Sequence, residues 1–264
     1  MQTAEPNLLG LVAHAFQFGV EITIEEIRKF PEFEELGLIT ACQEIEKKLE
    51  ECGLEMTPPI LEGELDEIRY IARKRQPESF ETALDEALGR GECQSVEFKE
   101  SLHLKKQLVD NPQISREHLV SQEIVFECIK TVCAFLNADG GTLLVGVNDD
   151  AEPCGLECEL GYLPGNSKTL DDWELYFANR LEHYIHDYRS CIGHVSWRLV
   201  TVGDVTVCVV VVRPRRHALT VCRHPRNLDD ELVYLRNGNG SAQIKARAIE
   251  GLVKNRLENQ LNSG

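Results

Sequence analysis

The sequence predicts an α+β protein in two parts, a small and mostly helical N-terminal module and a larger mixed α/β domain. Apolar residues recur at helical spacing through much of residues 1–53, whereas the longest strand patterns lie beyond residue 90. A polar segment with a proline, residues 71–77, places the domain boundary near residue 78. With 264 residues, the chain is long enough for both parts to bury a core.

We expect residues 1–78 to contain three helices and a small hairpin, which is a winged-helix-like order. The expected helices run from the cap Asn7 to Phe18 before Gly19, from the cap Thr23 to Pro31, and from about Thr40 to Cys52 before Gly53. Two short strands are expected between Leu54 and Ile71, around Pro58 and Gly63.

The charge of the third helix argues against DNA recognition by this module. The reading helix of a winged-helix DNA-binding protein is normally basic. Here, glutamates outnumber lysines, with Glu44, Glu46, Glu50 and Glu51 against Lys47 and Lys48. We therefore favour a role in packing or in contact with another protein.

The larger domain, residues 79–257, alternates helices and strands. Its expected helices are Phe80 to Leu88, Ser121 to Leu136, Trp173 to Ile185 with Asp171 or Asp172 as cap, and Gln243 to Leu257. Its expected strands are Val96 to Lys99, Thr142 to Val147, the hairpin Val195 to Val202 and Val205 to Val212, and Leu232 to Arg236. A glycine loop, Asn237 to Gly240, precedes the last helix, and residues 258–264 are expected to fray.

The strand Val96 to Lys99 carries a charged pair on one face. Val96 and Phe98 alternate with Glu97 and Lys99, so the strand buries the first pair and presents the second pair together. A carboxylate can hold a divalent cation, and a lysine beside it can orient a water molecule or meet a phosphate oxygen. This pairing is therefore a candidate catalytic site.

Two further carboxylates complete the candidate site. Asp149 follows the apolar run 142–147, and the ends of strands are where α/β proteins place chemistry. Glu92 requires a bend between residues 93 and 95 to approach Glu97, because their odd spacing on a continuous strand puts them on opposite faces. We predict that Glu92, Glu97 and Asp149 bind Mg²⁺ or Mn²⁺.

These residues lie in a pattern that resembles the AlbA-type core domain of the Schlafen family. The pattern is Glu-x4-Glu-Phe-Lys, a helix ending Ala-Phe-Leu-Asn, and Gly-Gly-x4-Gly-Val-x-Asp, and the likeness covers roughly residues 85–255. The resemblance implies a Schlafen-like mixed α/β fold and a metal-dependent endoribonuclease for structured, tRNA-like RNA. It implies that Glu92, Glu97 and Asp149 are the metal ligands, with Lys99 beside them. Residues 100–120 form a longer connection than is usual in the family.

The charge distribution both opposes and supports RNA binding. The net charge of −16 is unfavourable, because RNA affinity depends on neutralisation of phosphates. The segment Val205 to Leu228 contains no acid, however, and a local basic strip can bind phosphate on an acidic protein. The predicted RNA contacts are Lys105, Lys106, Arg213, Arg215, Arg216, Arg223, Arg226 and Arg236. A solvated loop would account for the strip equally well.

The ten cysteines do not form a convincing zinc motif. Most occur singly in apolar patterns, where a free thiol behaves as a small hydrophobic group; these include Cys42, Cys128, Cys133 and Cys208. The close pairs are Cys154 with Cys158 and Cys222 with His224, and whether they bind a metal is left open. No structural zinc is expected, although vertebrate Schlafens carry a zinc cluster.

The alternative to a nuclease is a non-catalytic nucleic-acid-binding or regulatory module of the same AlbA type. Such a module does not need Glu92, Glu97 and Asp149 to converge. An ATPase is disfavoured, because residues 161–169 resemble a phosphate-binding loop but have the wrong glycine spacing.

We expect a cytoplasmic protein with no membrane association, because the sequence lacks a signal-peptide pattern and an apolar run of about 18 residues. A homodimer is also expected. Vertebrate Schlafen nucleases join two related lobes in one chain, whereas this chain has one copy of each motif. A two-fold pair would double the basic strip and enclose the RNA.

Overall fold

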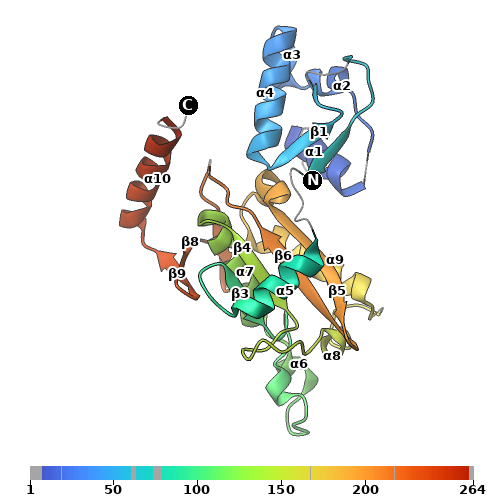
Figure 1. Cartoon of the computed structure of the whole chain (residues 1–264), viewed down its shortest axis with the longest axis vertical. Helices are drawn as coiled ribbons and strands as arrows, with labels where there is room; N and C mark the ends of the chain where they lie inside the picture. The colour runs from blue at the N-terminus through green and yellow to red at the C-terminus, as the bar shows by residue number, and fades with distance from the viewer. Residues whose placement is uncertain are drawn as a thin grey trace. The chain divides into compact units, whose positions relative to one another are not determined.

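The structure is a computed structural model that describes residues 8–18, 20–60, 64–73, 79–166, 168–216 and 218–261. The chain divides into two compact units (Figure 1). The first unit comprises residues 1–76 and 187–194, and the second comprises residues 77–186 and 195–264. The predicted boundary at residue 78 and the predicted cap Asn7 lie outside the described residues, as do Gly19 and Gly63.

The first unit is a helical core closed by a small hairpin. Its helices are α1 (Leu8–Phe18), α2 (Ile24–Arg28), α3 (Pro31–Glu34) and α4 (Leu38–Glu51), and its antiparallel strands are β1 (Leu54–Thr57) and β2 (Tyr70–Arg73). Thr23 caps α2 as predicted, because its side chain and that of Glu26 each accept a hydrogen bond from the other's backbone N–H. Gly53, at a φ of 74°, lets the chain leave α4 as predicted.

A short segment that is distant in sequence completes this unit. Residues 187–194, which include the 3₁₀ turn η3 (Tyr188–His194), belong to the first unit although the flanking residues belong to the second. The backbone N–H of Gly193 donates to the carbonyl of Cys52 at 2.9 Å. A Cβ atom at Gly193 would overlap that carbonyl, so the approach requires glycine.

The second unit is built on a four-stranded sheet in the order β3-β4-β6-β5. The strands are β3 (Val96–Lys99), β4 (Gly141–Val145), β5 (Val195–Val202) and β6 (Val205–Val212). β3 and β4 are parallel, and the other neighbours are antiparallel. The predicted hairpin β5–β6 and the predicted strand β3 are confirmed residue for residue.

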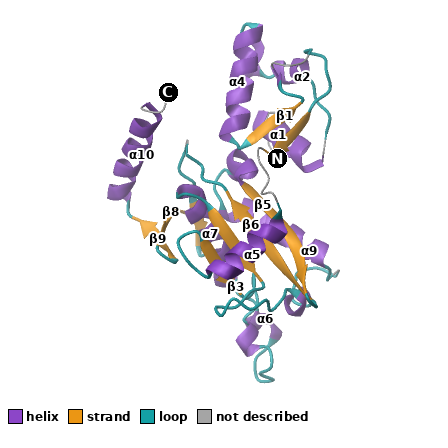
Figure 2. Ribbon diagram, viewed as in Figure 1, coloured by secondary structure: helices purple, strands orange, loops and turns teal. Residues whose placement is uncertain are grey.

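Helices cover both faces of this sheet (Figure 2). On one face, α5 (Phe80–Arg90) contacts β4, β5 and β6, and its Phe80 and Leu84 share a buried cluster with Val96 and Phe98 of β3. On the other face lie α7 (Gln122–Asn137) and α9 (Leu170–Tyr184). The short elements η2 (Lys106–Leu108), α6 (Arg116–Leu119) and α8 (Glu157–Leu160) lie in the connections. Because side chains alternate along a strand, Val96 and Phe98 lie on the α5 face of β3 and Glu97 lies on the opposite face.

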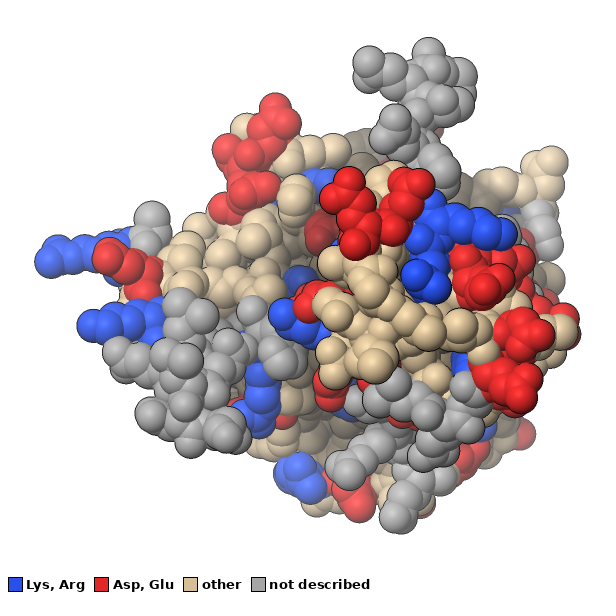
Figure 3. Space-filling model, turned by 90° about the horizontal axis from the view of Figure 1, so that it is seen from above, with Lys and Arg blue, Asp and Glu red and all other residues tan. Residues whose placement is uncertain are grey.

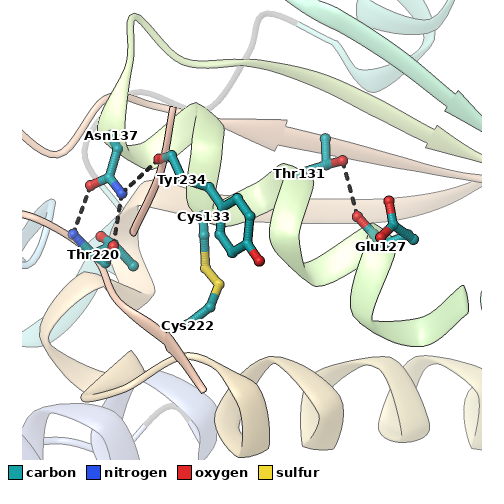
Figure 4. The surroundings of a disulfide bond; sticks show 7 residues. All are labelled: Glu127, Thr131, Cys133, Asn137, Thr220, Cys222 and Tyr234. Atoms are coloured by element: carbon teal, nitrogen blue, oxygen red, sulfur yellow. Dashed lines mark hydrogen bonds between the residues drawn. A yellow bond between two sulfur atoms is a disulfide. The ribbon is translucent and has the colours of Figure 1, made fainter. Parts of the chain in front are cut away.

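A three-stranded antiparallel sheet, β7-β8-β9, packs on α7. Its strands are β7 (Cys222–His224), β8 (Asn227–Asn237) and β9 (Gly240–Ile244), and α10 (Ala246–Leu261) follows. The Asn137 side chain joins the end of α7 to this region (Figure 4). Its Nδ2 donates to the carbonyls of Thr220 at 2.7 Å and Tyr234 at 3.1 Å, and its Oδ1 accepts from the Thr220 N–H at 2.7 Å.

One cysteine expectation is wrong. Cys133 was predicted to be a free buried thiol, but it forms a disulfide with Cys222 that links α7 to β7 (Figure 4). The two cysteines are 89 positions apart in sequence, and only the packing of β7 beside α7 brings their Cα atoms to 6.7 Å. Cys42, Cys128 and Cys208 are free and buried, as predicted.

Several element boundaries also differ from the prediction. Thr169 caps α9 in place of Asp171 or Asp172, and Asp172 serves as its capping-box partner. The helix α5 continues through Gly89 to Arg90 and stops before Gly91, which has a φ of 73°. Residues 240–244 form β9, so the last helix begins at Ala246 instead of Gln243. Among the described residues, none of the helices combines the length and apolar character of a membrane span.

A buried carboxylate on α8 joins the segment that follows β3 to α9 by hydrogen bonds. Glu159 on α8 accepts hydrogen bonds from Ser101 Oγ, from the Leu102 N–H at 3.1 Å and from Trp173 Nε1 at 2.7 Å, while His103 Nδ1 lies at 3.2 Å. Burial by itself would raise the pKa of the Glu159 carboxyl, but the hydrogen bonds and the charge of His103 lower it below its ordinary value.

We predict that Glu159→Gln reduces the free energy of unfolding by about 1–3 kcal/mol at neutral pH, because buried donors lose a charged acceptor. The folded-state pKa of Glu159 is lowered, so its contribution is present above the unfolded value of about 4.3 and is lost as the pH falls through the folded value. Urea denaturation at pH 7 and below pH 4 should show the difference between variant and parent shrinking at acid pH. The exposed control Glu117→Gln should have no effect, and an equal loss in both variants would contradict the prediction.

Candidate functional site

A tight turn folds the segment that carries Glu92 back onto β3, the strand that carries Glu97. The backbone N–H of Cys93 donates to the carbonyl of Val96 at 3.0 Å, and the N–H of Val96 donates to the carbonyl of Cys93 at 3.3 Å. The chain therefore folds back on itself, and the N–H of Phe98 donates to Glu92 Oε1 at 2.9 Å. The bend that was expected between residues 93 and 95 is confirmed.

Glu97 lies between two cations. Its Oε1 accepts a hydrogen bond from Lys99 Nζ at 2.5 Å, and its Oε2 accepts one from Arg236 Nη1 at 2.9 Å. The Glu97 side chain is 12% exposed, so these pairs are largely withdrawn from water. An ionised carboxylate in such a position requires partners of opposite charge, and the two cations supply them.

Arg236 on β8 holds the turn as well as Glu97. Its side chain has no exposed surface, its Nε donates to the carbonyl of Gln94 at 3.1 Å, and its Nη2 donates to that of Cys93 at 2.8 Å. Its guanidinium also lies 4.8 Å from the ring centroid of Phe135 on α7. The donors of Arg236 are directed to the protein's own backbone and to the side chains of Glu97 and Ser241. The predicted contact of Arg236 with RNA stays a prediction.

Lys99 stays protonated at neutral pH. Burial lowers the pKa of its ammonium, but the hydrogen bond and charge of Glu97, together with the charges of Cys128 and Glu92, outweigh burial and raise it. Lys99 Nζ also donates to the carbonyl of Phe98 at 3.0 Å. The residue can therefore act as a positive charge and hydrogen-bond donor, and it is unsuited to act as a base.

Asp149 lies in the turn that follows β4. The register pairs Lys99 with Val145, and the N–H of Gly146 donates to the carbonyl of Lys99 at 2.7 Å. Asp149 is exposed, and no hydrogen bond or ion pair within the described residues joins it to Glu92 or Glu97. Among all the residues that the structure describes, no three His, Cys, Asp or Glu side chains are grouped so as to hold a metal ion. The sharing of one ion by the three carboxylates stays a prediction.

Several of the residues predicted to contact RNA make contacts within the protein. Arg223 Nη1 donates to the carbonyl of His183 at 3.2 Å, Arg226 forms an ion pair with Glu123, and Lys106 Nζ donates to the carbonyl of Gly155 at 2.8 Å. Lys105, Arg213 and Arg215 are half-buried, and Arg216 is exposed. On the face drawn in Figure 3, Asp and Glu side chains lie among Lys and Arg side chains.

The two cysteine pairs left open as metal ligands have different surroundings. Cys222 is joined to Cys133, so its sulfur is unavailable as a thiolate ligand while that disulfide is intact. Cys154 and Cys158 are free thiols, and Lys106 Nζ lies 3.3 Å from Cys154 Sγ. The ammonium group of Lys106 in this position competes with a metal ion for the sulfur of Cys154.

Sequence reasoning did not find Arg236 as a partner of Glu97. The two residues are 139 positions apart, and the signal in the sequence was only a lone arginine at the end of an apolar strand pattern.

A model of the protein family described as Schlafen, AlbA_2 matches residues 92–245 of the chain. The match covers more than half of the 264 residues and lies within the second unit apart from residues 187–194. It includes Glu92, Glu97, Lys99, Asp149 and Arg236.

We predict that Arg236→Met reduces the free energy of unfolding by about 3–5 kcal/mol, because Glu97 keeps its burial and loses one of two cations. Urea denaturation measures the loss. The double variant Arg236→Met/Glu97→Gln should recover part of it, because the buried charge is then removed. The exposed Arg247→Met on α10 is the matched control. A single variant as stable as the parent, or a double variant no more stable than the single one, would contradict the stabilising role of the Arg236–Glu97 ion pair.

Proposed function

The chain belongs to the Schlafen AlbA_2 family, and we propose that it is a metal-dependent endoribonuclease that cleaves structured, tRNA-like RNA. Membership of this family indicates a function related to nucleic acid. The observation that carries the finer proposal is that the turn before β3 holds Glu92 on the N–H of Phe98, which lies between Glu97 and the protonated Lys99 in the sequence. Carboxylate oxygens can hold a divalent ion, and a cation beside them can meet a phosphate oxygen, which together suit phosphodiester hydrolysis.

The donor chemistry fits Mg²⁺ or Mn²⁺, which prefer carboxylate oxygens. In the proposal, Glu92 and Glu97 hold the ion, and Asp149 in the turn after β4 is the third ligand. When bound, such an ion supplies activation of water and stabilisation of charge on phosphate.

The chain's own residues have three tasks in this proposal. The N–H of Phe98 fixes one oxygen of Glu92, and Arg236 fixes one oxygen of Glu97. Lys99 keeps its proton, so it neutralises and donates to a phosphate oxygen of the RNA. The two carboxylates are thus oriented before substrate arrives, which reduces the reorganisation needed for reaction.

RNA contacts are proposed for the basic residues that retain exposed surface, and Arg216 and Arg226 are the exposed arginines of the strip. The half-buried Lys105, Arg213 and Arg215 are proposed to support them. A homodimer is proposed to supply additional phosphate contacts, because one copy offers a narrow strip on an acidic protein.

A non-catalytic nucleic-acid-binding or regulatory module is the second candidate, and one observation favours it. Both oxygens of Glu97 already accept hydrogen bonds from cations, Lys99 and Arg236. A carboxylate neutralised in this way is able to act as a purely structural group that holds the turn and β8 together. The two candidates differ in whether RNA is cleaved in a metal-dependent manner.

We predict that the purified chain cleaves tRNA with Mn²⁺ and that EDTA abolishes cleavage. Because even outer-shell partners of a metal ligand are worth about 10–100-fold, Glu92→Gln or Glu97→Gln should reduce the rate by about 100-fold or more. The exposed Asp204→Asn at the tip of the β5–β6 hairpin should cleave at the parental rate. Gel analysis of tRNA fragments measures the rate. Binding of tRNA without cleavage would favour the regulatory module instead.

We also predict that Arg216→Glu weakens RNA binding and lowers the dependence of log Kd on log salt by about one charge, because a phosphate contact is lost. Fluorescence anisotropy across a salt titration measures this slope. Arg247→Glu changes the net charge equally at an exposed site outside the strip and serves as the control. Identical slopes for parent and Arg216→Glu would show that the strip is a solvated loop.

A further inference from the structure

The first unit contains a groove between α4 and β1. It has a volume of about 260 Å³ and is lined by Glu46, Leu49, Glu50, Leu54, Glu55, Met56, Pro59 and Ile60. The apolar lining residues Leu49, Leu54, Met56 and Ile60 also belong to the buried core of this unit. The floor is therefore held by the packing of the core, so the groove is preformed.

The size of the groove limits what it can hold. Pockets for small-molecule ligands and cofactors usually enclose about 300–1,000 Å³, which is more than this groove offers. A space of this size, lined by glutamates as well as by apolar side chains, suits one anchoring side chain of a peptide.

The rim of the groove is acidic. Glu46 and Glu50 are one helical turn apart on α4, and Glu55 lies on β1. Like charges at this helical spacing repel each other, so a cation placed between them is favourable. The surrounding sequence reinforces the effect, because residues 1–80 contain 17 Asp or Glu and 8 Lys or Arg.

We propose that this groove, formed by Glu46, Leu49, Glu50 and their neighbours on β1, is a docking site for a basic peptide segment of another protein. An apolar side chain of the peptide enters the groove, and flanking lysines or arginines contact the glutamates of the rim. The acidic rim and the apolar floor select together for this chemistry, since an acidic peptide is repelled and a purely polar one has no anchor. Nucleic acid is excluded by the same charge.

The test uses the full chain and a short fluorescent peptide in which lysines and arginines flank a central pair of leucines. Anisotropy should show saturable binding, and Glu46→Lys/Glu55→Lys should weaken it by about tenfold or more, because two attractions become repulsions. Glu34→Lys/Glu35→Lys on and beside α3 changes the net charge equally at exposed positions outside the groove. This control should bind the peptide as the parent does. A second peptide with serines in place of the leucines should bind at least about tenfold more weakly.

Four results would overturn the proposal. The first is an absence of peptide binding at about 1 mM, and the second is equal weakening by the rim variant and its control, which would mean general attraction to an acidic surface. The third is binding of an RNA or DNA oligonucleotide that the rim variant loses. The fourth is self-association that light scattering detects in the parent and not in the rim variant, which would make a second copy the occupant.

Discussion

The ion pair between Arg236 and Glu97 is the interaction on which the geometry of the candidate site depends. Removing a guanidinium and a carboxylate from water costs several kcal/mol for each ion, and the pair is stable only when further hydrogen bonds compensate. Arg236 supplies them, because it donates to the carbonyls of Cys93 and Gln94 and lies over the ring of Phe135. One side chain thereby connects β8, the turn before β3 and α7, three segments that are far apart in the sequence.

The same arrangement sets the electrostatic character of the site. Two carboxylates, Glu92 and Glu97, are balanced locally by two cations, Lys99 and Arg236. The raised pKa of Lys99 follows from this balance and keeps its charge at neutral pH. A net charge of −16 opposes the binding of phosphate, so the proposed function depends on a cation that is retained beside the carboxylates.

Local patterns in the sequence predicted the elements that depend on local physics. The hairpin β5–β6 and the burial of Val96 and Phe98 follow from alternation, and the bend before β3 follows from the requirement that Glu92 approach Glu97. The partners that depend on tertiary packing were not visible. Arg236 was read as an RNA contact and Cys133 as a free thiol, because nothing near them in sequence reveals Glu97 or Cys222. The inclusion of residues 187–194 in the first unit has the same cause.

The proposed function rests on Glu92, Glu97 and Asp149 as the ligands of one divalent metal ion, and the two glutamates are the part that can be tested most directly. Titration of the purified chain with Mn²⁺ measures metal binding directly and without a substrate. Calorimetry, or the electron paramagnetic resonance of the free ion, monitors the titration. We predict one Mn²⁺ site per chain that Glu92→Gln or Glu97→Gln abolishes and that Asp204→Asn leaves intact. Unchanged Mn²⁺ binding in both glutamate variants would contradict it, and the carboxylates would then serve only to hold the turn and β8 together.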